Sequence, residues 1–209
     1  MRGALLQALI CISLTGVIVP LLEHSIWTNI TTTLALYVIF PATFAASMAA
    51  DAFAGERERK TLETLLATPL SDYSIFVGKI ATAVTFVVAI SAMSLFAAIL
   101  GTAYKGDFGA VSLQAVGGSL AGAFSASLLI TAVSIAIAAK MPVARSAQQL
   151  GFLATFGIAA VALTVLERLR IPLNWTTMLY VDAFAFLTGA IALFVAMQRF
   201  HRERFFESR

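Results

Sequence analysis

Charged residues are scarce in this chain, and most of them are concentrated in a few places. Asp, Glu, Lys and Arg make up 12% of its 209 residues, whereas a soluble domain carries about 25%. Apolar residues account for 60% of the chain, and the mean hydropathy is +0.91. This composition excludes an ordinary soluble domain and indicates an integral membrane protein.

Residues that commonly carry catalysis or bind metals are also few. The chain has one cysteine, Cys11, which excludes an intramolecular disulfide, and two histidines, His24 and His201. The spacings HExxH, CxxC and GxSxG, typical of zinc proteases, redox or metal sites and hydrolases, are absent from the sequence. We therefore expect no catalytic site, no metal site and no cofactor on this chain.

A phosphate-binding loop is missing as well. Gly78-Lys79 is followed by Ile80 rather than by Ser or Thr, and Tyr73 stands where the first glycine of such a loop would be. Without this loop the chain is not expected to be an ATPase. If the protein does driven work, the energy must come from a partner or from an ion gradient.

Six long stretches contain almost no charge, and they predict the fold class. Each is near or above the roughly 18–20 residues that a helix needs to cross the hydrocarbon core. Barrel strands would instead alternate polar and apolar residues over about 10 residues. We predict an all-α polytopic membrane protein, a single transmembrane domain over residues 1–209, with six transmembrane helices at about 4–22, 30–50, 80–101, 111–139, 149–166 and 176–198.

The Lys and Arg residues are unequally divided between the two sides of this six-helix topology. Three of the 14, Lys105, Arg168 and Arg170, lie in the loops on one side, and the others lie on the side of the termini. Positively charged residues are typical of cytoplasmic loops. We expect both termini and the 51–79 segment to be cytoplasmic. The net charge of +3, distributed in this way, requires no nucleic-acid partner.

One carboxylate, Asp182, lies inside a predicted transmembrane helix. Ionisable groups within the membrane often mark the route of a substrate, proton or ion. Asp182 either contacts a substrate or cation, or it faces the bundle and is satisfied by Thr176, Thr177 or a neighbouring helix, or it is hydrated from an outer cavity. A single carboxylate does not decide between these readings, so Asp182 is a candidate for the substrate pathway.

Glycine and proline positions predict how two of the helices pack and bend. Gly118 and Gly122 form a GxxxG pattern, which favours close helix packing, and we expect this packing to lie within the subunit. Pro41 lies in the middle of the second predicted helix. Because proline removes one helical hydrogen bond, we expect a kink at this position.

The longest connection, between the second and third predicted helices, contains the sequence AGERERKTLETLLATPLSD, with six charges between Glu56 and Glu63. Helix-favouring residues dominate it as far as Pro69. Three leucines, Leu62, Leu65 and Leu66, fall on one stripe of an amphipathic helix. Spacing alone leaves three interpretations open: a solvated loop, an interfacial helix, or a helix that docks on a soluble partner.

The string GERERKTLETLLATPLSDYSIFVGK, residues 55–79, resembles the stretch between helices two and three of ABC-2 type transporter permeases. In that family a Glu-rich start, a Thr-Leu-Glu-x-Leu-Leu core, a Thr-Pro pair and a Gly-Lys pair recur in this order. The resemblance implies a coupling helix that docks on a separately encoded ATP-binding subunit. The residues implied in that contact are Glu56, Glu58, Arg59, Thr61, Leu62, Glu63, Leu65 and Leu66.

From this resemblance we expect a membrane-spanning permease subunit of an ABC transporter, working as an exporter in the lipid bilayer of a prokaryotic cell (plasma) membrane. A second permease copy or a homologous permease would complete the transport pathway. ATP and Mg would bind to the partner ABC ATPase and not to this chain. The family often has glycine before Thr-Leu-Glu, where this chain has Lys60.

Two alternatives from other functional classes remain open at this point. An ATP-independent secondary transporter or channel would use Asp182 for ion coupling. A membrane scaffold would use the charged connection only to anchor a soluble protein. A reading frame for an ATP-binding cassette protein beside this one would favour the permease.

Overall fold

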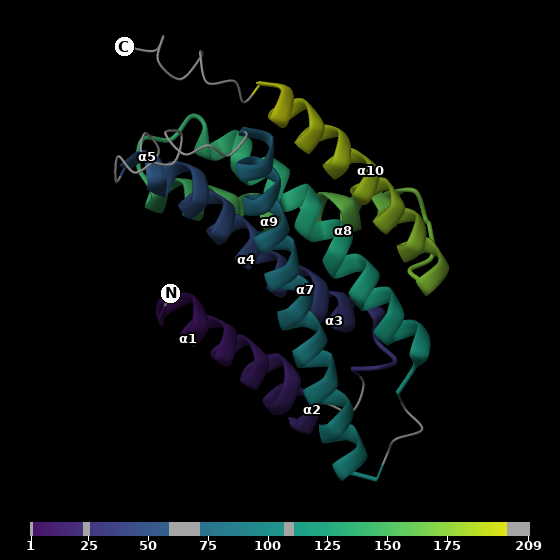
Figure 1. The fold of residues 1–209 in the computed structure, drawn as a ribbon. Coiled ribbons are helices and arrows are strands. Elements are labelled where there is room, and N and C mark those ends of the chain that lie inside the picture. The colour runs from purple at the N-terminus through teal and green to yellow at the C-terminus, as the bar shows by residue number, and fades with distance from the viewer. Residues whose placement is uncertain (1, 23–25, 59–71, 107–110, 200–209) are drawn as a thin grey trace.

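The computed structural model is a bundle of long helices (Figure 1). It describes residues 2–22, 26–58, 72–106 and 111–199, and these residues form no strand. Five helices are long and apolar enough to cross a membrane, at Ile30–Gly55, Tyr73–Tyr104, Leu113–Ala138, Ala144–Arg168 and Trp175–Gln198. A shorter apolar helix covers Ala8–Leu22, where the first predicted helix lies. The prediction of an all-α polytopic membrane protein is confirmed.

Two of the six long helical stretches are built from several helical types joined without a break. The first consists of α1 (Arg2–Cys11), η1 (Ile12–Ile18) and α2 (Val19–Leu22). The second consists of α3 (Ile30–Leu34), η2 (Ala35–Ile39), α4 (Phe40–Ala50), η3 (Asp51–Gly55) and α5 (Glu56–Glu58). The four regular stretches are α7 (Asp72–Tyr104), α8 (Leu113–Ala138), α9 (Ala144–Arg168) and α10 (Trp175–Arg199).

Wide π-helical turns precede both prolines of the first two stretches. The turn η1 ends two residues before Pro20, and η2 ends two residues before Pro41. Proline has no N–H, so the carbonyl four residues before it loses its helical donor. For Pro41 this is the carbonyl of Tyr37, which accepts a hydrogen bond from Ser91 Oγ of α7 at 2.7 Å. The structure thus records a π-helical segment before Pro41, and the predicted kink itself stays a prediction.

Polar caps determine where three of the helices begin. Asn29 Oδ1 accepts the backbone N–H groups of Thr31 and Thr32 at the start of α3. Ser112 caps α8, and Asn174 Oδ1 accepts the N–H of Thr177 in the first turn of α10 at 2.8 Å. Such side chains satisfy backbone donors that have no partner inside the helix.

Helix α8 lies at the centre of the packing, against α4, α7, α9 and α10. Its two GxxxG glycines make close approach possible: a Cβ on Gly118 would lie 2.6 Å from Cε3 of Trp175, and one on Gly122 would lie 3.0 Å from Cγ2 of Val38. On α10, a Cβ on Gly189 would lie 2.7 Å from the backbone nitrogen of Leu129. The predicted close packing within the subunit is confirmed.

One end of the bundle gathers segments that are distant in the sequence. The end of α5, the start of α7, the turn between α8 and α9, and the C-terminal end of α10 lie toward the same end (Figure 1). This arrangement agrees with the alternating topology on which the sidedness prediction depends.

Candidate functional site

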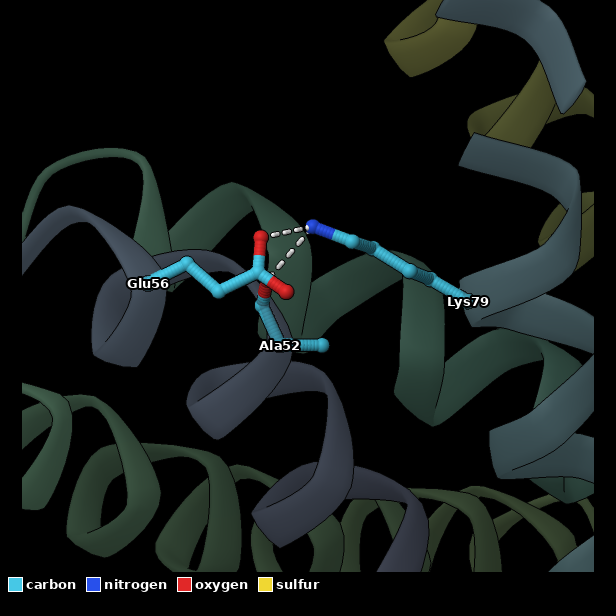
Figure 2. A network of polar contacts seen from close by, with 3 residues as sticks. All are labelled: Ala52, Glu56 and Lys79. Atoms are coloured by element: carbon cyan, nitrogen blue, oxygen red, sulfur yellow. Dashed lines mark hydrogen bonds and ion pairs between the residues drawn. The ribbon is translucent and has the colours of Figure 1, made fainter. Parts of the chain in front are cut away.

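An ion pair joins the two helices on either side of the charged connection. Lys79 Nζ on α7 pairs with the carboxylate of Glu56 on α5 (Figure 2). The same ammonium group donates a hydrogen bond to the backbone carbonyl oxygen of Ala52 at 2.8 Å. Lys79 is 12% exposed and Glu56 is 25% exposed, so the pair is shielded from solvent more than a surface salt bridge is.

One aromatic ring lies close to the ammonium group of Lys79. Its Nζ atom lies 4.9 Å from the ring centroid of Phe53, a geometry that favours a cation–π interaction. The Phe53 ring meets the ring of Phe76 edge-on, with a centroid distance of 5.6 Å, and Phe76 is fully buried. The ion pair therefore lies beside an aromatic cluster that links η3 to α7.

A second carboxylate from the same short helix reaches a different part of the bundle. Glu58 Oε2 accepts a hydrogen bond from the backbone N–H of Ala144 at 2.9 Å, at the start of α9. Val143, the residue at the N-cap position, provides no side-chain cap of its own. Negative charge is favourable at a helix N-terminus. Glu58 thus takes the place of the missing cap and connects α5 to α9.

Small side chains allow these segments to approach closely. Ala50, Ala54, Ala138, Ala144 and Ala147 form one buried cluster where α4 and η3 meet the turn between α8 and α9. Gly55 is also buried here, and a Cβ at this position would lie 2.6 Å from Asp51 Oδ1 and 3.7 Å from the Cβ of Ala144. The end of the second helical stretch is therefore packed directly on the base of α9.

A partly open cavity of about 130 Å³ lies among the helices, and Asp182 is the acidic residue that lines it. The lining side chains come from α3, η2, α4, α8, α9 and α10, and most of them are apolar. Ser125 and Thr155 supply the hydroxyl groups. The Oδ2 atom of Asp182 is buried without a hydrogen-bond partner in the described part of the chain.

A larger groove of about 700 Å³ lies between α1, α4 and α9. Its lining includes two hydroxyl and two amide side chains, those of Thr43, Ser47, Gln148 and Gln149. Amide and hydroxyl groups are unfavourable when they face lipid hydrocarbon. The polar part of this groove is therefore suited to contact with protein or water.

Comparison with known proteins gives one match. The family model described as "ABC-2 family transporter protein" matches residues 25–199. The chain belongs to this family. No curated protein and no solved structure matches it. As an ABC-2 family member the chain is the membrane permease component of an ABC transporter, and the family implies an ABC ATPase partner.

Eight residues of this ABC-2 permease were predicted to contact the ATPase, and the structure describes two of them. Glu56 and Glu58 both make contacts within the chain, with Lys79 and with the Ala144 backbone. Their contact with an ATPase stays a prediction. The other six, Arg59, Thr61, Leu62, Glu63, Leu65 and Leu66, lie outside the described residues.

The sequence reasoning missed the partners of these two glutamates. The structure pairs Glu56 with Lys79, which lies on the far side of the charged connection. Lys79 was visible as part of the Gly-Lys motif, but its role as a counter-ion was not. Nothing in the local sequence of Ala144 indicates that a distant glutamate caps its helix.

The structure shows where the Asp182 side chain of this permease lies. Thr177 Oγ1 donates its proton to the carbonyl oxygen of Pro172 at 2.9 Å, so this hydroxyl does not satisfy Asp182. The Asp182 side chain lies against α8 instead, where a Cβ on Gly122 would be 3.3 Å from its Oδ1 atom. Asp182 therefore faces the bundle, as one interpretation predicted, and also lines a cavity, as the other requires.

Proposed function

We propose that this ABC-2 permease is the membrane subunit of an exporter, driven by a separate ATP-binding subunit that docks on residues 51–72. The observation that carries the proposal is the pair of carboxylates on α5. Glu56 bonds to Lys79 on α7, and Glu58 bonds to the N-terminus of α9. A force applied to the charged connection would reach two membrane helices through these contacts.

Closure of the ATPases on ATP would displace the connection relative to the bundle. Because Glu58 is bonded directly to the Ala144 backbone, α9 would move with α5 rather than independently of it. Helix α9 lines both the cavity beside Asp182 and the larger groove. A displacement of α9 would therefore change the shape of the cavity and of the groove. In this way ATP binding at the ATPase would shift the population of permease conformations.

A second permease copy or a homologous permease completes the transport pathway in this proposal. The groove between α1, α4 and α9 supports it, because Gln148 and Gln149 are not suited to lipid contact. The two permeases would lie in a prokaryotic cell membrane with their termini in the cytoplasm. ATP and Mg would then bind to the ATPase on that side.

Co-purification tests the docking proposal directly. The tagged permease is co-expressed with the ATP-binding cassette protein encoded beside it, and the ATPase retained after affinity purification is quantified. We expect retention with the unchanged chain and its loss, by about tenfold or more, with Leu66→Asp, which places a charge on the leucine stripe.

A matched control makes the same change at the other end of the bundle. Leu113 is 86% exposed at the start of α8, where an aspartate is tolerated by the helix N-terminus. Leu113→Asp should leave ATPase retention unchanged. If the unchanged chain retains no ABC ATPase, or if Leu66→Asp and Leu113→Asp behave alike, the docking proposal is wrong.

A further inference from the structure

We propose that the cavity beside Asp182 is a binding site for a lipophilic organic monocation, whose positive charge pairs with the Asp182 carboxylate. This inference rests on the proposed export function in one respect: the bound cation would be the substrate that is exported. The cavity belongs to a single permease chain, since all of its lining residues come from the helices described above.

The first argument is the unsatisfied carboxylate oxygen. Asp182 Oδ2 is buried and has no hydrogen-bond partner among the described residues. The adjacent hydroxyl of Ser125 points its proton at the carbonyl groups of Ala121 and Gly122, at 2.9 and 3.2 Å. A buried polar atom of this kind is costly unless a ligand satisfies it.

The second argument is the absence of an internal counter-ion. No Lys, Arg or His is among the described residues that line the cavity. A buried carboxylate is stabilised by a positive charge that donates hydrogen bonds. Since the described lining supplies none, the complementary charge is expected to come from outside the chain.

The remaining walls determine the chemical class of the cation. A metal ion such as Ca²⁺ needs six to eight oxygen ligands, whereas the described lining offers one carboxylate and the hydroxyls of Ser125 and Thr155. Thr155 Oγ1 already donates to Gly151 O. The other walls are aliphatic, formed by residues such as Leu163 and Met178. One charge within an apolar enclosure fits an ammonium group attached to a hydrocarbon body.

Size and position indicate how such a ligand would enter. If a water-sized group takes about 10–15 Å³, a cavity of about 130 Å³ accepts roughly ten non-hydrogen atoms. The cavity lies between α9 and α10, which expose much apolar surface, including Val161 and Leu179. A ligand dissolved in the hydrocarbon layer could therefore reach it from the side.

Equilibrium binding of radiolabelled n-octylamine to the full-length chain in lipid nanodiscs tests the inference. Octylamine is positively charged at neutral pH and has nine non-hydrogen atoms, and empty nanodiscs measure its partition into lipid. The comparison ligand is n-octanol, which has the same length and no charge. We expect saturable octylamine binding, with octanol bound at least about tenfold more weakly.

Three variants assign the binding to the cavity. Asp182→Asn removes the charge while keeping the shape, and should weaken octylamine binding by about tenfold or more. Ala162→Phe fills the cavity from α9 without touching the carboxylate, and should also abolish binding. Glu167→Gln neutralises an exposed carboxylate on α9, the helix that carries Ala162, and should leave octylamine binding unchanged.

The inference is overturned if the unchanged chain shows no saturable octylamine binding. It is equally overturned if Asp182→Asn binds octylamine with the same affinity as the unchanged chain. If Asp182→Asn does not fold, the same result with Ala162→Phe overturns it. The assay contains no ATPase, so it is independent of the co-purification experiment. Octylamine binding without ATPase retention would contradict only the exporter, and retention without octylamine binding would contradict only this site.

Discussion

The two glutamates of α5 have different structural roles because their carboxylates contact different groups. Glu56 and Glu58 are two residues apart, yet one pairs with a lysine side chain and the other caps a helix. The first contact is an ion pair between partly buried side chains, and the second is a charge-assisted bond to a backbone N–H. Substitutions should therefore affect the two positions differently.

Glu56→Gln leaves the Lys79 ammonium group without its charged partner in a half-buried position. We expect a loss of about 1–2 kcal/mol, because a partly buried pair contributes more than an exposed one. The midpoint of thermal unfolding in nanodiscs should fall by several degrees, whereas Glu167→Gln, at an exposed carboxylate, should have little effect. Equal midpoints for the two variants would show that the pair does not stabilise the bundle.

Glu58→Ala removes the cap of α9, and we expect a cost of about 1 kcal/mol. Glu58→Gln keeps an oxygen that can accept the Ala144 N–H, so it should lose only part of this stabilisation. Amide hydrogen exchange measured by mass spectrometry reports the difference locally. Exchange in the first turn of α9 should be fastest in Glu58→Ala, intermediate in Glu58→Gln and slowest in the unchanged chain; the opposite order would contradict the capping role.

At the scale of helices, the packing of α8 depends on which of its neighbouring glycines faces a partner. A Cβ on Gly118 would overlap the Trp175 ring, whereas a Cβ on Gly117 would have nothing within 4 Å. Gly118→Ala should destabilise the bundle by about 1–3 kcal/mol through overpacking. Gly117→Ala should be neutral or slightly stabilising, since alanine favours helices. Thermal unfolding of the two variants, one residue apart, separates packing from helix propensity; equal midpoints would contradict the α8–α10 contact.

The helices themselves could be predicted because the membrane demands long apolar runs with internally bonded backbones. Their ends were less predictable, since α9 begins at Ala144 rather than near residue 149, and its start depends on the distant carboxylate of Glu58. The π turns before Pro20 and Pro41 could not be predicted. The turn η2 is compatible with Pro41 partly because Ser91, on another helix, bonds to the Tyr37 carbonyl.

For the whole molecule, the sequence pointed to candidate residues but not to the contacts that these residues make. Asp182 was recognisable as a carboxylate in an apolar run, but the cavity beside it is assembled from several helices and has no local signature. Lys79 was likewise recognisable in the sequence, but its partner Glu56 lies on the other side of the charged connection and could not be read from it. Contacts of this kind depend on tertiary packing, which periodicity does not encode.

In the proposed mechanism, α9 couples the charged connection to the cavity beside Asp182. The link consists of Glu58 at the start of this helix and of cavity-lining residues such as Leu163 farther along it. ATP binding by a docked ATPase should therefore change the separation of α9 and α10. The side chains of Val161 and Leu179 are exposed on these two helices and suit the attachment of labels.

The most direct test is the distance between spin labels at Val161→Cys and Leu179→Cys, measured by pulsed electron paramagnetic resonance in the permease–ATPase complex. The one native cysteine, Cys11, is buried and can be replaced by alanine. We expect added ATP and Mg to shift the distance distribution, Leu66→Asp to abolish this shift, and Leu113→Asp to preserve it. A distribution that does not respond to ATP, or one that responds equally in Leu66→Asp, would contradict the coupling of this segment to the membrane helices.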